Sequence, residues 1–411
     1  MRYDALVIGA GPAGSTAANR LAAAGWSVAI VEKSAFPRQK VCGEFVSASV
    51  AELLHALGAG DAYESSAGPE VRRVGLFARD GAVVAPMPRV EGGRRAYGRA
   101  VGRDRLDTLL LECAARRGAK LWQPYRAADL RADGGEYVCT IESKGGLASK
   151  RDTRRLRARI VVAAHGSYET GPLPTQHARP RARSDLLAFK ARFEDARLAS
   201  DLMPLLAFPG GYGGLVHTDA GRASLSCCIR RDALEACRRA RAGRAGEAVL
   251  EHILGACVPA RDALAHAKLE GAWLAAGPIA PGIRAFRADA ERTGGGLGGI
   301  FAVGNAAGEA HPVIAEGISM AIQGADLLAG LLVASQDRIG SPAARAEVGR
   351  RYAAAWRGRF GARLRAAALF ARLASSEHAA GLLLPLARAL PGAISLGARW
   401  SGKAQRAGAS A

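Results

Sequence analysis

The hydrophobic pattern at the amino terminus alternates between short apolar runs and one longer segment with helical spacing. Apolar residues dominate 3–8 and fill 28–31, and runs of this length are typical of buried parallel strands. Between them, residues 12–24 begin with a proline and end before Gly25, as helices often do. The pattern therefore predicts a strand, a helix and a second strand in immediate succession.

A glycine-rich turn, VIGAGPAG, joins the first strand to the helix. Gly9 permits the tight turn, Gly11 lets the backbone approach a pyrophosphate, and Gly14 allows close packing of helix on strand. The free N–H groups and positive dipole end of the helix then face the phosphates. Glu32 ends the second strand, where its carboxylate can accept both ribose hydroxyls. This arrangement predicts nucleotide binding, and an ordinary glycine-rich α/β turn is the alternative.

A second glycine-rich segment, FAVGNAAGEAHPVIAEGISMA, contains an apolar strand at 300–303 and leads into a helix near 316–317. The chain also contains the loop FPRQKVCGEFVS at 36–47 and the helix VGRDRLDTLLLECAARRGAKL at 101–121. With these motifs it resembles the FAD-dependent monooxygenase and geranylgeranyl reductase superfamily, which has the fold of p-hydroxybenzoate hydroxylase. The resemblance covers most of residues 1–335 in motif order. It implies an α/β fold with a Rossmann-like FAD-binding domain of the glutathione reductase type.

The resemblance implies FAD as the cofactor and NAD(P)H as the electron donor. Where the family carries an Asp-Gly pair, RIVVAAHGS has His165 before Gly166, which weakens the case for NAD(P)H. Asn305 replaces the acid of the second turn, and an asparagine can still hydrogen-bond a ribityl hydroxyl. The residues expected to bind FAD are Gly9, Gly11, Pro12, Ala13, Gly14, Glu32, Lys33, Cys42, Gly43, Arg103, Gly304, Asn305, Gly308, Gly317 and Ile318.

Three side chains on loops that the family places near the flavin are candidate catalytic groups. Glu44 and His311 are candidate acid–base groups, and Cys42 is a candidate proton donor. Each has a structural alternative, which is a surface glutamate, a capping histidine or a small buried thiol, respectively. Arg103 could likewise be a surface arginine rather than a cofactor ligand.

The resemblance leaves two reactions open. The favoured one is hydroxylation of an aromatic or polyketide-type intermediate of secondary metabolism through a flavin C4a-hydroperoxide, which the apolar turn at 312–314 shields from water. The alternative is a geranylgeranyl-reductase-like reduction of C=C bonds in an isoprenoid or other unsaturated substrate. A non-catalytic FAD-binding assembly partner is a third hypothesis. No W-x-W-x-I-P segment occurs, which argues against a flavin-dependent halogenase.

The rest of the pattern predicts an interleaved substrate domain and a helical tail. The expected FAD-binding domain comprises 1–75, 95–185 and 285–335, and the mixed β-sheet substrate domain comprises 76–94 and 186–284. The substrate domain begins with a hairpin whose turn contains Asp80-Gly81. Residues 336–411 are predicted to be helical, with an apolar stripe of Tyr352, Trp356, Phe360, Leu364 and Leu369. The tail is either packed core or a wall for a long or membrane-borne substrate.

Composition narrows the possible partners. The net charge is +20, but 49 of the 57 basic residues are arginine and aromatic residues make up only 6%, so no nucleic-acid-binding stripe is expected. The positive field could attract an acidic carrier protein or a membrane surface. The seven cysteines form no C-x-x-C pair and the histidines show no metal-ligand spacing, so no metal site is expected. The odd cysteine count without a secretory signal predicts a cytoplasmic protein. The resemblance implies that it acts on a small hydrophobic or aromatic molecule.

Overall fold

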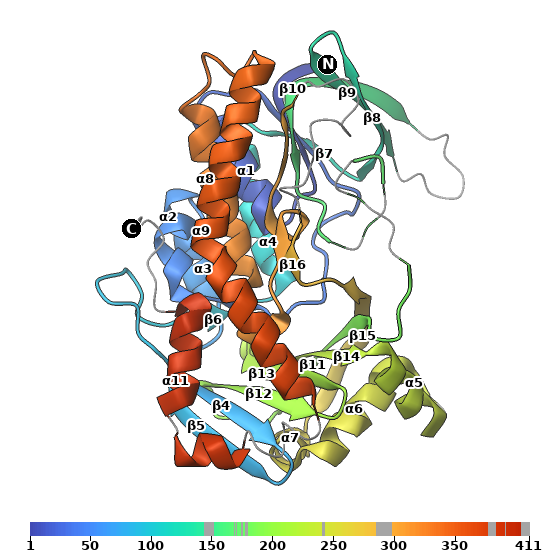
Figure 1. Cartoon of the computed structure of the whole chain (residues 1–411), viewed down its shortest axis with the longest axis vertical. Coiled ribbons are helices and arrows are strands. Elements are labelled where there is room, and N and C mark those ends of the chain that lie inside the picture. Colours follow the sequence, from blue (N-terminus) through green and yellow to red (C-terminus); the bar gives the residue numbers. More distant parts are fainter. Residues whose placement is uncertain are drawn as a thin grey trace.

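Two seven-stranded sheets form the body of the molecule, and the carboxy-terminal helices extend from one sheet to the other (Figure 1). The computed structural model describes residues 1–143, 152–167, 169, 171–173, 176, 180–240, 243–284, 298–376, 384–390 and 392–403. The architecture confirms the α/β fold class expected from the sequence.

The first sheet is built around the amino-terminal strand. Its order is β7 (Lys120–Trp122), β2 (Val28–Val31), β1 (Arg2–Ile8), β10 (Thr153–Ala163), β9 (Glu136–Ser143) and β8 (Tyr125–Asp133), with β17 (Ile300–Ala302) also paired to β10. β1 pairs in parallel with both β2 and β10. The turn after β1 therefore lies in the middle of the parallel strands, where ligands of such sheets bind.

Three helices pack side by side against this sheet: α1 (Pro12–Ala23), α4 (Arg103–Arg116) and α8 (Gly317–Val333). α1 contacts both of the others. A Cβ at Gly14 would lie 1.9 Å from the carbonyl oxygen of Gly9, and one at Gly304 would lie 2.9 Å from the Cβ of Ala13. Only glycine permits helix and turns to approach this closely.

The second sheet is mixed. Its order is β15 (Lys268–Ile279), β11 (Leu186–Glu194), β14 (Ala223–Arg230), β13 (Gly211–His217), β12 (Leu202–Phe208), β4 (Arg73–Ala78) and β5 (Gly81–Pro86). Only β12 and β4 pair in parallel within this sheet. β4 begins at Arg73, before the expected boundary at 76, because its pairing with β12 starts there. Ala78 pairs with Gly81, so the hairpin turn consists of Arg79 and Asp80 rather than Asp80-Gly81.

The two faces of the second sheet have different coverings. One face packs on α5 (Arg231–Ala240), α6 (Ala245–Ala256) and α7 (Val258–Leu264). The other carries Leu76, Tyr212 and Cys228 and packs on α9 (Pro342–Ser375) and the helical residues 384–389. α11 (Gly392–Ala398) and η6 (Arg399–Lys403) complete this side, where α11 lies beside β4 and β5 (Figure 1).

The apolar stripe of α9 is buried for most of its length but not at its end. Tyr352, Trp356, Phe360 and Leu364 are buried, and the hydroxyl of Tyr352 donates to the Ala302 carbonyl at 3.1 Å. Leu369, expected on the same stripe, is 58% exposed, because the buried face of α9 continues through Ala367 and Ala371 and a residue two positions from each lies on the opposite face.

Short elements connect the larger ones. They are β3 (Phe45–Val46), η1 (Ala48–Val50), α2 (Ala51–Ala56), α3 (Gly60–Ser66), β6 (Arg99–Ala100), η2 (Asp219–Gly221), β16 (Gly282–Ile283), η4 (Gly304–Ala306), β18 (Gly308–Glu309) and η5 (Pro312–Ile314). Within the described ranges, no helix has the length and apolarity that crossing a membrane requires.

Candidate functional site

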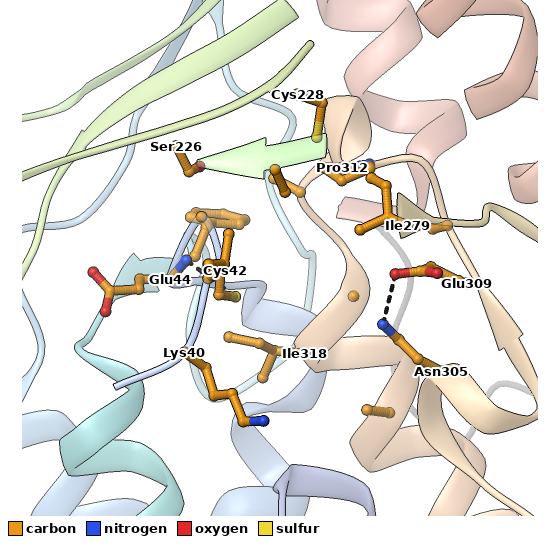
Figure 2. A pocket seen from close by; sticks show the side chains of 18 of the residues that line it. Lys40, Cys42, Glu44, Ser226, Cys228, Ile279, Asn305, Glu309, Pro312 and Ile318 are labelled. Atoms are coloured by element: carbon orange, nitrogen blue, oxygen red, sulfur yellow. Dashed lines mark hydrogen bonds between the residues drawn. The ribbon is translucent and has the colours of Figure 1, made fainter. Parts of the chain in front are cut away.

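A cavity of about 1180 Å³ extends from the glycine-rich turn after β1 to the carboxy-terminal helices. Gly11 and Glu32 line one end, and Leu205, Phe370 and Leu386 line the other. Both sheets contribute to its walls, so the cavity joins the parallel-strand turns to the substrate-domain sheet. Figure 2 shows side chains around this cavity.

The carboxylate of Glu32 is fixed at the end of β2. It is buried, and its two oxygens accept hydrogen bonds from the backbone N–H groups of Ala10 and Ser34, both at 2.9 Å. Lys33 follows it and pairs with Glu169 at 2.5 Å. Gly11 precedes α1, and a Cβ there would meet only the Nη2 atom of Arg103 at 3.8 Å. The space above the start of α1 is therefore open toward the cavity.

Two arginines converge on the buried carboxylate of Asp107 beside this turn. Arg103 donates to it through Nε at 2.7 Å and Nη2 at 2.8 Å, so Arg103 is not the surface arginine of the alternative hypothesis. Arg38 lies 3.2 Å from the Asp107 carboxylate and 3.7 Å from Glu32. The buried Nε of Arg38 has no hydrogen-bond partner among the described residues. A buried donor of this kind suits an anionic group such as a pyrophosphate.

The loop of sequence KVCGE, which comprises residues 40–44 and is called the KVCGE loop, crosses the middle of the cavity. Cys42 is partly exposed there and accepts a hydrogen bond on Sγ from the backbone N–H of Glu44 at 3.4 Å. Glu44 has a φ of 61°, a left-handed conformation that turns the chain at this point. Figure 2 shows Cys42 and Ile318 near each other on one wall, with the Glu44 carboxylate directed away from them.

Glu44 is fully buried in a network of charges. Its Oε1 accepts from Nη2 of Arg192 at 2.8 Å and from the backbone N–H of Arg103 at 3.1 Å, and it also pairs with Lys190. Burial lowers the pKa of Lys190. These contacts rule out the surface-glutamate alternative and indicate that Glu44 anchors the loop. Its acid–base role stays a prediction.

His311 belongs to a buried chain of polar groups on the opposite side of the cavity. Its Nδ1 lies 3.2 Å from the hydroxyl of Tyr212, and the thiol of Cys228 lies near the same hydroxyl. Burial, together with the Arg372 charge, lowers the pKa of His311 to about 4, so the imidazole is neutral at pH 7. The His311 side chain makes no capping hydrogen bond to η5, and the capping alternative is wrong.

Asn305 is oriented by an acid that the sequence analysis missed. Its Nδ2 donates to Oε1 of Glu309 at 2.9 Å (Figure 2), and Glu309 also accepts from Arg284 and from the backbone N–H of Ala280. Because the amide nitrogen is used in this way, the carbonyl oxygen of Asn305 is the atom that can accept from a ribityl hydroxyl.

The start of α8 carries a second buried pair. Glu316 is fully buried, and Nζ of Lys403 lies 3.4 Å from its Oε1 and donates to the Ile314 carbonyl. Burial raises the pKa of Glu316 and lowers that of Lys403. Lys403 lies far from this helix in the sequence, and no motif marked this residue as part of the site.

The structure gathers most of the expected FAD-binding residues around this one cavity. Those that line it are Gly9, Gly11, Pro12, Ala13, Glu32, Lys33, Cys42, Gly43, Arg103, Gly304, Asn305, Gly317 and Ile318. Gly14 and Gly308 serve packing instead, because a Cβ at Gly308 would lie 2.4 Å from the Trp356 ring. The residues present fit FAD. Among the described residues, no group of three His, Cys, Asp or Glu side chains could hold a metal ion.

The fold and the cavity thus have the features of an FAD-binding protein. Residues 2–170 match the family model described as an FAD binding domain. This match and the structural neighbours confirm the resemblance to the FAD-dependent monooxygenase and geranylgeranyl reductase superfamily. The match covers less than half of the chain, so it identifies the domain rather than the reaction.

Relatives and solved structures agree on the fold. The chain is 32% identical over 186 residues to tryptophan 2-halogenase of Chondromyces crocatus (43% of this chain, 32% of that protein). It is 32% identical over 143 residues to menaquinone reductase of Mycobacterium tuberculosis (35% and 34%). A geranylgeranyl bacteriochlorophyll reductase-like protein from Thermoplasma acidophilum superposes with a TM-score of 0.71 at 19% identity, covering 96% of this chain and 91% of that one. The chain spans about a third of the length of the curated relatives it matches.

Proposed function

We propose that the protein is an FAD-dependent monooxygenase that hydroxylates an aromatic or polyketide-type natural-product intermediate. The observation that carries this proposal is the hydrogen bond between Tyr212 and His311 at the wall of a largely apolar cavity. A buried hydroxyl with a neutral imidazole behind it can polarise a phenolic substrate, which an oxygenation of an electron-rich ring requires.

The chain's own groups would orient the substrate and move its proton. Bound FAD supplies the activation of oxygen. A substrate hydroxyl would donate to the Tyr212 oxygen while Tyr212 donates to Nδ1 of His311, which raises the electron density of the ring. One atom of O₂ enters the ring and the other leaves as water. We assign NAD(P)H as the source of the two electrons.

The same wall would exclude water from the reaction. Pro312, Val313 and Ile314 all line the cavity beside His311, and they offer no side-chain donor or acceptor. A dry site strengthens the electrostatic interactions within it and suppresses competing hydrolysis. Glu44 and Lys190 would hold the KVCGE loop against this space without taking part in proton transfer.

The test is the origin of the oxygen in the product. Purified holoenzyme is incubated with NADPH, ¹⁸O₂ and a panel of phenols, and the masses of the products are measured by mass spectrometry. We expect the product formed by the parent protein to gain the mass of one ¹⁸O atom. The Tyr212→Phe variant should lose the ability to form this product. A product that gains two hydrogens and no oxygen would contradict it.

A second candidate function is reduction of a C=C bond in an unsaturated substrate. The position of the Cys42 thiol favours it, since Cys42 lines the cavity beside Arg103. In this reaction bound FAD would supply the hydride equivalent to one carbon, and the Cys42 thiol would give the proton to the other carbon of the double bond. Cys42→Ser would then lower turnover strongly, whereas the monooxygenase proposal expects Cys42→Ser to retain most of it.

A further inference from the structure

Large apolar side chains are exposed on the carboxy-terminal helices. Of ten exposed large hydrophobic residues in the described part of the chain, six fall between 369 and 400. They are Leu369, Phe370, Leu386, Leu390, Leu396 and Trp400, with exposed fractions between 36% and 63%. We call this group the apolar rim. Scattered single residues need no explanation, but a concentration on one segment does.

The apolar rim surrounds the outer end of the cavity. Phe370 and Leu386 are exposed and also line the cavity. A Cβ at Gly397 would lie 3.5 Å from the Phe370 ring, so α11 packs directly on the end of α9. Apolar side chains of α9, of the helical residues 384–389 and of α11 line the cavity further in. They are Ala374, Ala387, Ile394 and Ala398. The cavity therefore reaches the surface through an apolar wall that the rim continues outward.

Positive charge accompanies the apolar rim. Residues 342–403 contain eleven arginines and lysines in the described ranges, against one acid, Glu347, and all but the buried Arg345, Arg363 and Lys403 are at least partly accessible. The exposed Arg365, Arg388 and Arg399 lie within four positions of a rim residue, and Arg365 and Leu369 share one face of α9. Exposed leucine and tryptophan next to arginine is the composition of helices that lie on an anionic lipid surface. A second copy of the chain would present the same positive charge and be repelled.

We propose that the apolar rim binds an anionic membrane surface, and that the cavity takes from it an amphiphile with a reactive ring and a long apolar chain. The assignment of the ring rests on the proposed function, whereas the membrane contact does not. The apolar chain of the amphiphile would lie along the wall formed by Leu373, Ala374 and Ile394, and its ring would lie beside Tyr212.

The membrane contact is tested by flotation of the purified holoprotein with vesicles. One set contains phosphatidylcholine alone and the other adds 30% phosphatidylglycerol. We expect binding to the anionic vesicles only, reduced by 0.5 M NaCl. Leu369→Asp and Leu390→Asp each reduce the partition coefficient about tenfold or more. Arg365→Gln reduces it about fivefold, as one charge near such a surface contributes that factor.

Matched controls use equally exposed residues away from the apolar rim. Leu269→Asp on β15, which is 44% exposed, and Arg117→Gln after α4 should leave binding unchanged. Retained flavin absorbance shows that each variant is folded. Absence of binding by the parent protein, or an equal loss in Leu269→Asp, overturns the proposal. A change of molar mass by light scattering in Leu390→Asp, without vesicle binding, assigns the rim to a protein interface and also overturns it.

The chain length of the substrate is tested by binding rather than by turnover. 4-Alkylphenols of two to twelve carbons are titrated into oxidised holoprotein, and the flavin absorbance change reports occupancy. We expect Kd to fall about threefold to fourfold per methylene over the middle of the series. Ala374→Phe should end this trend at a shorter chain. A Kd independent of length contradicts the long-chain substrate. Binding without hydroxylation in the ¹⁸O₂ experiment contradicts only the proposed function.

Discussion

The two ends of the cavity are encoded in different ways. At the nucleotide end, Gly9, Gly11, Gly14 and Glu32 lie within one strand–helix–strand unit, and short-range geometry places them. At the substrate end, β4, β12, β13, α9 and α11 come from segments that lie as far apart as residues 78 and 392. Local motifs therefore specify where the cofactor binds, whereas tertiary packing specifies what lies next to it.

The largest expected effect is a difference between the same substitution at two glycines of the segment that follows β1. Gly14→Val drives a side chain into the Gly9 carbonyl and should destabilise the fold by about 3 kcal/mol or more. A Cβ at Gly11 would meet only the Nη2 atom of Arg103, at 3.8 Å, so in Gly11→Val the fold should survive while FAD is lost. Thermal unfolding and bound-flavin absorbance measure the two effects. A yellow Gly11→Val protein with normal FAD content would refute the assignment of this turn.

The second largest effect is expected in the buried charge network of Glu44, Lys190 and Arg192, which joins the two ends of the cavity. Glu44→Gln leaves Lys190 and Arg192 without their shared carboxylate and should cost about 3–5 kcal/mol in unfolding free energy. In the double variant Glu44→Gln/Lys190→Met most of this cost should be recovered, because the unpaired buried ammonium is gone. Urea titration gives both values. Equal stability of Glu44→Gln and the parent protein would show that the network is not buried in solution.

The substrate end is tested by Tyr212→Phe, which removes one oxygen from the Tyr212–His311 pair. We expect kcat to fall about a hundredfold with FAD binding and stability retained. The matched variant Tyr63→Phe also removes a buried hydroxyl, but Tyr63 lies on α3, its hydroxyl donates to the Arg99 carbonyl, and it does not line the cavity. It should keep kcat unchanged. Similar rates for the two variants would remove Tyr212 from the mechanism.

A smaller effect follows from the low pKa of His311. The folded value is about 4 and the unfolded value about 6.5, so the unfolded chain binds the proton more tightly. The contribution of His311 to the free energy of unfolding is therefore fully present above pH 6.5 and is lost as the pH drops toward 4. After allowance for solvent screening the loss is about 1–2 kcal/mol. His311→Gln should lack this part of the pH dependence in urea titrations at pH 4, 5 and 7. An identical slope in both proteins would contradict the burial of His311.

The smallest expected effect concerns Asn305. Asn305→Asp restores the acid that the family carries in this turn, yet it places a carboxylate against that of Glu309. Repulsion between the two should weaken FAD binding roughly threefold to tenfold, as one of them must take up a proton. Glu309→Gln in the same chain should restore the affinity, measured by fluorescence titration of the apoprotein. Tighter FAD binding by the single Asn305→Asp variant would be the opposite result.

Sequence reasoning anticipated the nucleotide end because its geometry is periodic and local. The strand at 28–31, the helix from Pro12 and the fixed carboxylate of Glu32 all appear as expected. Gly308 was assigned to the cofactor, but its small size serves the Trp356 ring, a contact between residues forty-eight positions apart. A glycine does not reveal in sequence which neighbour requires it.

The substrate end could not be anticipated in the same way. Lys190 and Arg192 alternate with apolar residues on β11, a pattern that ordinarily indicates solvent exposure, and they are buried only because Glu44 faces them. Lys403 likewise had no motif around it, yet it reaches Glu316 at the start of α8. Buried polar networks of this kind depend on strand register and helix packing, which no single segment encodes.

The most direct test of the central claim, that the cavity is a dry site for oxygen chemistry next to the flavin, is stopped-flow reoxidation of the reduced holoenzyme. Reduced protein is mixed with oxygenated buffer, with and without a phenol that binds, and the flavin spectrum is followed in time. The account predicts a transient absorbance distinct from both reduced and oxidised flavin, which decays faster with the phenol present. Slow, single-step reoxidation that no phenol alters would contradict it and favour reduction of a C=C bond.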